Sequence, residues 1–339
     1  MIRRRLAIPL ALVSLLAGCG GGATDRHAAA RPDLPAIAPG AVTETSRSLR
    51  IAGTDRSAQD VATAAAAAPD AAGVRSELAP LPRAAFRPPI ARWRAGSRRE
   101  AAAFAAAVAR LRADVAAGAV AAARRDWLAA DVRLARIGAA YGALGPLGVA
   151  LAGRPGRLTG GVSSRRFTGM HAVERALWTA RDRARLPVLT AGLVRDGARL
   201  RRRIAAMAVS PLDYTLRAHE ILEDAQRDDL SGEAAPWSGA GLRVTAGAYA
   251  ATRRVVGTLR PLLEGRGDAL EPVESGLRSF GAELAAVRRA HGGALPSQRA
   301  LGRRERERLD GRLGQLLEAL AAIPPSLETR LPSAIPSLP

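Results

Sequence analysis

The sequence predicts an all-α protein, a bundle of about eight helices behind a flexible tether. Alanine, leucine and arginine dominate the 339 residues, and all three are strong helix formers. From residue 96 onward, apolar side chains recur at helical spacing. No stretch of useful length alternates with the two-residue period of a strand.

The chain is expected to divide into four parts: a signal peptide over 1–18, a tether over 19–95, a helical domain over 96–325 and a flexible tail over 326–339. The tether is a weakly patterned mixture of Gly, Ala, Pro, Ser and Thr, which cannot bury enough apolar surface to become ordered.

Within the domain, Ser97 and Glu100 have the spacing of a capping box and predict a helix that begins near Gly96. A second helix is expected over 119–143. A long loop over 145–166 follows, and Thr168 is expected to cap the next helix. Further helices are expected at about 187–207, 212–230, 238–263, 270–290 and 296–322.

The N-terminus has the features of an export signal. Three arginines precede an apolar stretch over 6–16 that is too short to span a bilayer comfortably. Leu16-Ala17-Gly18-Cys19 resembles the lipobox of bacterial lipoproteins, in which the cysteine carries the lipid. We therefore expect a protein attached to the membrane through Cys19 and facing the periplasm or the extracellular side. An ordinary secretory signal with an incidental cysteine is the alternative.

The formal net charge of +20 does not by itself indicate nucleic-acid binding. All 51 basic residues are arginine, and they are spread through helical segments with acids between them. A nucleic-acid interface needs a clustered basic footprint, so none is expected here. Cys19 is the only cysteine, which excludes an intramolecular disulfide and a cysteine-rich metal site.

Two helical segments carry candidate metal ligands. His171 and Glu174 are three residues apart and project from one helix face, close enough to share a cation. A histidine hydrogen-bonded to its own glutamate in a packed helix is the alternative. In the second segment His219 and Glu223 are four apart, beside Glu220. A solvated acidic face explains that segment equally well.

Taken together, these segments resemble the imelysin-like peptidase superfamily and, within it, the EfeO-type iron-uptake lipoproteins. The family motif is Gly-x-His-x-x-Glu-x-x-Leu-Trp. The matching residues here are Gly169, His171, Glu174, Leu177 and Trp178. The segments 138–142, 219–223, 237–239 and 304–324 also agree, so the resemblance covers about residues 96–325.

The resemblance implies two helical-bundle halves with the His-x-x-Glu helix lining a cleft between them. It also implies capture of iron, as Fe²⁺ or Fe³⁺, or of zinc or another divalent metal. Its implied partners are an iron permease and a haem-peroxidase-type protein of the uptake system. Close relatives carry acids where this chain has 134–136 and 146–148, and those acids are missing here. Asp131, Tyr141, Glu220 and Glu223 are candidates to replace them.

The expected metal site is therefore His171, Glu174, Glu220, Glu223 and Asp131. The leading hypothesis is an envelope lipoprotein that binds iron for uptake through a permease. The alternative is a metal-free helical scaffold of the same fold, consistent with the missing acids. A metallopeptidase with Glu174 or Glu220 as general base is a third hypothesis. No catalytic residue is assigned, because nucleophile elbows and phosphate-binding loops are absent from the sequence.

Overall fold

The computed structural model describes residues 81–138, 144–179 and 181–327, all within one compact unit, Arg75–Pro339. These residues form helices joined by turns, with no strand among them, which confirms the all-α prediction. The expected signal peptide, Cys19, Tyr141 and nearly all of the expected tail lie outside the described residues.

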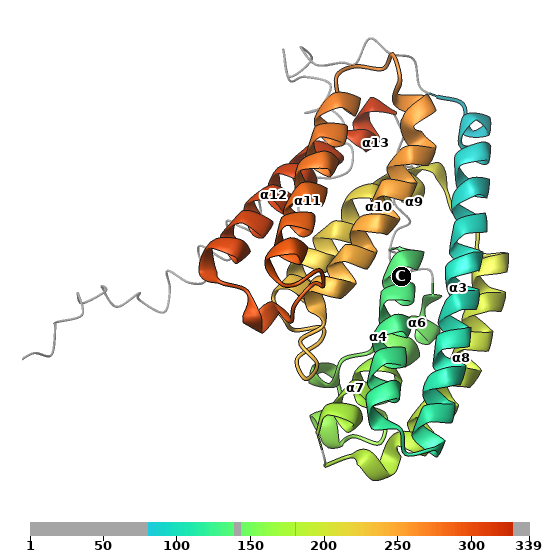
Figure 1. Cartoon of the computed structure of the whole chain (residues 1–339). Coiled ribbons are helices and arrows are strands. Elements are labelled where there is room, and N and C mark those ends of the chain that lie inside the picture. Colours follow the sequence, from blue (N-terminus) through green and yellow to red (C-terminus); the bar gives the residue numbers. More distant parts are fainter. Residues whose placement is uncertain (1–80, 139–143, 180, 328–339) are drawn as a thin grey trace, which may run out of the picture. The chain divides into compact units, whose positions relative to one another are not determined.

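The helices form two groups, coloured blue-green to yellow-green and yellow to red in Figure 1. In the first group α3 packs along α4 and α8, and α7 packs against α4 and α8. Its helices are α3 (Arg87–Ala116), α4 (Val120–Ile137), α6 (Pro146–Ala152), α7 (Gly169–Trp178) and α8 (Leu186–Ala206). The second comprises α9 (Pro211–Asp224), a π-helix (Ala225–Leu230), α10 (Gly241–Leu263), α11 (Leu270–Ala290), α12 (Arg303–Ala321) and α13 (Ile323–Ser326).

Helix α10 joins the two groups, because it packs against α9 and α11 of its own group and against α4 and α3 of the other. The approach to α4 is close. A Cβ atom added at Gly247 would lie 3.1 Å from the carbonyl oxygen of Val132. Apolar burial continues across the junction, where the rings of Trp93 on α3 and Tyr214 on α9 meet edge to face at 6.0 Å. The junction is therefore packed core as well as the place where a cavity opens.

The first helix begins earlier than the sequence predicted. Helix α3 starts at Arg87, with prolines in its first turn where their missing N–H groups cost nothing. The predicted capping box is wrong, because Ser97 is buried in the middle of α3 and its hydroxyl donates to the carbonyl oxygen of Ile137 at 3.4 Å. Glu100 instead forms ion pairs with Arg133 and Arg254 at 3.0 and 3.6 Å.

The expected long loop over 145–166 is only partly a loop. It contains α6 and two short 3-10 turns, Pro155–Arg157 and Gly161–Ser163. Pro146 stands in the first turn of α6 and presets its backbone angle, so the Gly- and Pro-rich composition masked a helix. Thr168 is the N-cap residue of α7, but its side chain makes no capping hydrogen bond.

Candidate metal-binding cavity

A cavity of about 740 Å³ opens at the junction of the two helix groups. Its walls come from α4, from α6 and the loop after it, from α7, from the last turn of α9, from the π-helix and from α10. Acidic residues gather there although the chain as a whole is strongly basic: Asp131, Asp224, Asp228 and Asp229 line the cavity. Arg154, Arg166, Arg227 and His171 also line it.

Helix α7 is positioned by Gly169 and by Trp127. Gly169 has φ +78°. A Cβ atom there would meet the carbonyl oxygens of Ala150 and Leu151, the latter at 2.6 Å, so only glycine fits against α6. One residue on, the Nε1–H of buried Trp127 donates to the carbonyl oxygen of Met170 at 2.9 Å. These contacts fix the first turn of α7, which carries His171.

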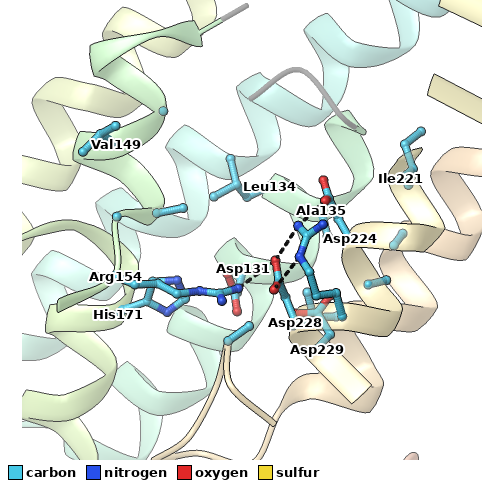
Figure 2. Close-up of a pocket in the computed structure, with 18 of the residues that line it drawn as sticks. Asp131, Leu134, Ala135, Val149, Arg154, His171, Ile221, Asp224, Asp228 and Asp229 are labelled. Carbon is cyan, nitrogen blue, oxygen red and sulfur yellow. Dashed lines mark hydrogen bonds and ion pairs between the residues drawn. The ribbon is translucent and has the colours of Figure 1, made fainter. Parts of the chain in front are cut away.

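His171 lies on the cavity wall with only 8% of its surface exposed (Figure 2). Burial lowers the pKa of His171 to about 4, and the nearby guanidinium of Arg154 lowers it further, against smaller opposing effects of Asp228 and of hydrogen bonds to the backbone of Ala152 and Ala234. The ring is therefore neutral at physiological pH. Its Nδ1 atom is buried and makes no hydrogen bond of ordinary geometry with the described residues.

Glu174 lies one turn further along α7 and is fully buried, but it does not line the cavity. Its Oε1 atom accepts hydrogen bonds from the backbone N–H groups of Trp237 and Ser238, at 3.2 and 2.7 Å, and from the Ser238 hydroxyl at 2.7 Å. Its Oε2 atom makes no hydrogen bond with the residues that the structure describes. Burial raises the pKa of Glu174 to about 7, although the Ser238 and Trp237 hydrogen bonds favour the charged form. Glu174 thus ties the first helix group to the loop before α10.

Asp131 lies on α4 and faces the cavity beside His171 and Asp228 (Figure 2). It makes no hydrogen bond or ion pair with the described part of the chain. Burial, and secondly the negative charge of Glu174, raise the pKa of Asp131 to about 7. The cavity therefore holds a carboxyl group in a place that disfavours its charge, and none of the described arginines or histidines forms an ion pair with it.

The acidic residues on the opposite wall of the cavity were not predicted from the sequence. Asp228 and Asp229 lie on the π-helix that follows α9 and bring two carboxyl groups to the cavity. Burial raises the pKa of Asp229 well above its ordinary value, as do the charges of Asp131 and Asp228. The sequence signal was the run Asp224-Ala225-Gln226-Arg227-Asp228-Asp229, but regular α-helical spacing does not place all its acids on one face. A π-helix changes that spacing and is common at functional sites.

Glu220 and Glu223 do not line the cavity. Both are exposed on α9, and Glu223 forms an ion pair with His219 at 3.4 Å. The expected set of five ligands is thus divided: His171 and Asp131 line the cavity, Glu174 lies behind it, and the two α9 glutamates face solvent. The acidic pattern on α9 thus corresponds to a solvated helix face, which was the alternative interpretation of that segment.

The donor chemistry suits iron or zinc, which take imidazole nitrogen and carboxylate oxygen. The donor groups are of suitable types, but their positions do not form a complete metal site. Among the described residues, no group of three or more His, Cys, Asp or Glu side chains is already placed to hold one metal ion. Binding there would therefore require side chains of the cavity wall to move.

Comparison of the chain with protein-family models gave no match, and comparison with curated proteins gave none either. The resemblance to the imelysin-like superfamily therefore depends on the residues quoted above. In the described ranges, no helix is both long and apolar enough to cross a membrane.

Proposed function

We propose that this protein is a cell-envelope lipoprotein whose cavity captures a metal cation, foremost iron, for delivery to a membrane permease. One observation supports this most strongly. A neutral, buried histidine whose Nδ1 atom makes no hydrogen bond with the described residues lies on the same cavity as Asp131, a carboxyl group that has no hydrogen-bond or ion-pair partner among those residues.

Buried polar atoms are nearly always hydrogen-bonded, because leaving one unpaired costs about 1–3 kcal/mol. A cation would supply the missing partner for His171 Nδ1 and the missing counter-charge for Asp131. It would also replace the proton that the raised pKa of Asp131, about 7, implies near neutral pH. Glu174 would act indirectly, by fixing the orientation of α7 through its hydrogen bonds to Trp237 and Ser238.

The test is a calorimetric titration of the chain from residue 19 onward, carrying Cys19→Ser, with Fe²⁺ under anaerobic conditions and with Zn²⁺. We expect saturable binding near one ion per chain, lost in His171→Ala. His219→Ala is the matched control, because His219 is partly exposed on α9 and does not line the cavity. Binding that survives in His171→Ala, or falls equally in both variants, would refute the site.

A metal-free scaffold is the second candidate, because the described residues hold no ready-made group of three ligands and Glu174 is already engaged by the 237–238 backbone. It predicts that the same titration of the unsubstituted chain shows no saturable binding of either ion. In that case the Gly-x-His-x-x-Glu motif would serve packing: Gly169 for helix contact and Glu174 for attachment of the loop.

A further inference from the structure

Arg154 extends from the loop after α6 into the cavity, where Figure 2 shows it beside His171 and directed toward Asp228. Its Nη2 atom lies 2.8 Å from a carboxylate oxygen of Asp228, and its Nη1 atom lies 3.5 Å from one of Glu233. The two ends of one guanidinium group thus bind two carboxylates of the other helix group.

The pairing with Asp228 is partly shielded from water. The Asp228 side chain is 19% exposed and that of Arg154 is 34% exposed, whereas Glu233 is 70% exposed. The Arg154–Asp228 contact is therefore the stronger of the two, because screening weakens exposed pairs most. Together with Arg227, the Arg154 guanidinium already occupies one of the carboxylates that a captured cation would need.

The other arginines at the cavity differ from Arg154. Arg227 also pairs with Asp228, at 3.2 Å, but it is the preceding residue in the chain, and its other partner, Asp224, is only three residues before it. It therefore makes only local contacts. Arg166 lines the cavity and has no ion pair with the described residues. Arg154 alone among the three holds a carboxylate across the junction of the helix groups.

We propose that Arg154 is a tethered counter-ion of the cavity, which a metal cation must displace from Asp228 in order to bind. The inference rests on the proposed function and adds to it a basis for selectivity. A monovalent ion gains little by replacing a guanidinium group of equal charge that has two carboxylate partners. An ion of charge two or more gains more from Asp228, Asp131 and His171 together, since Coulomb attraction grows with charge. Displacing Arg154 also breaks the ion pair between the loop after α6 and the π-helix. Capture of the ion would therefore loosen the contact between these two segments, and release of the ion would restore it.

The experiment compares Zn²⁺ and anaerobic Fe²⁺ titrations of the unsubstituted chain with those of Arg154→Gln and Arg166→Gln. Both substitutions remove one positive charge from the cavity lining, but only the first removes the ion pairs. We expect Arg154→Gln to bind the ion about tenfold more tightly than the unsubstituted chain, and Arg166→Gln to change the affinity by less than about threefold. Arg154→Lys keeps the charge but loses the guanidinium group that reaches two carboxylates, so its affinity for the ion should lie between those of Arg154→Gln and Arg166→Gln. Circular dichroism verifies that each variant is folded.

The outcomes separate the two proposals. Binding in all variants, with Arg154→Gln no tighter than Arg166→Gln, overturns the counter-ion and leaves the proposed function standing. Weak or undetectable binding by the unsubstituted chain, together with His171-dependent binding by Arg154→Gln, supports the counter-ion. No His171-dependent binding by any of these proteins overturns both.

Discussion

Replacing Asp131 with asparagine tests whether burial in the cavity makes the charged form of the Asp131 carboxyl group unfavourable in the folded protein. The side chain keeps its size but loses its ionisable proton. In the native protein the pKa of Asp131 rises from 3.8 to about 7. Between these pH values the native chain holds a proton that the unfolded chain has released, so this group's contribution to the free energy of unfolding decreases as pH rises through the window.

A rise of about 3 pH units, at 1.36 kcal/mol per unit, sets an upper value of about 4 kcal/mol for the cost at pH 8. Glu174 shares part of that cost, because its own pKa is raised to about 7 and the two groups interact. We therefore expect Asp131→Asn to raise the free energy of unfolding by about 2 kcal/mol at pH 8 and by less than half as much, about 0.8 kcal/mol, at pH 5, where only the part of the window between 3.8 and 5 has been crossed.

The assay is urea denaturation with chelator present, at both pH values. Asp126→Asn on the same helix is the matched control. It removes a surface ion pair with Arg110 and should change stability by less than about 1 kcal/mol at either pH. An equal effect of Asp131→Asn at pH 5 and pH 8 would refute the reasoning, because it would mean that the carboxyl group is not protonated in the folded state near neutrality.

Three further outcomes are expected. Gly169→Ala should lower the free energy of unfolding, measured by urea denaturation, by about 2–4 kcal/mol, because the added Cβ atom would meet carbonyl oxygens. Its control is Gly118→Ala, where φ is also positive (+68°) but the space is open, and there the loss should be only about 1 kcal/mol. Equal losses in the two variants would contradict the packing argument. Glu174→Ala should speed amide hydrogen exchange at Ser238 by on the order of tenfold, and unchanged exchange would show that the hydrogen bonds do not hold the loop. Glu223→Gln should leave metal affinity within about twofold, since its side chain faces solvent; a larger loss would restore it as a ligand.

Long, strongly amphipathic helices were predictable from the sequence. The expected helix over 270–290 coincides with α11, because apolar residues at helical spacing and the following glycines bound it clearly. The start of α3 was not predictable in the same way. Pro88 and Pro89 fall within the predicted tether, where prolines are typical of flexible segments. Prolines are also compatible with the first turn of a helix, and only tertiary packing decides between a tether and a helix here.

The site was predicted on one side only. His171 was identified because its neighbours form a recognisable motif, and the structure places it on the cavity. Asp228 and Asp229 were missed because their position depends on a π-helical turn, which hydrophobic periodicity does not reveal. Glu174 looked like a ligand by spacing alone. Its contacts with Trp237 and Ser238 join residues far apart in sequence, which no local pattern encodes.

The division of the cavity between two helix groups has a consequence for the order in which the chain is made. Synthesis begins at the N-terminus, so α4 and α7, with Asp131 and His171, are complete before the π-helix with Asp228 has been added. A nascent chain that ends before residue 225 lacks Asp228 and Asp229 of the cavity. Under the proposed function, loading of the ion would therefore follow folding of the finished chain.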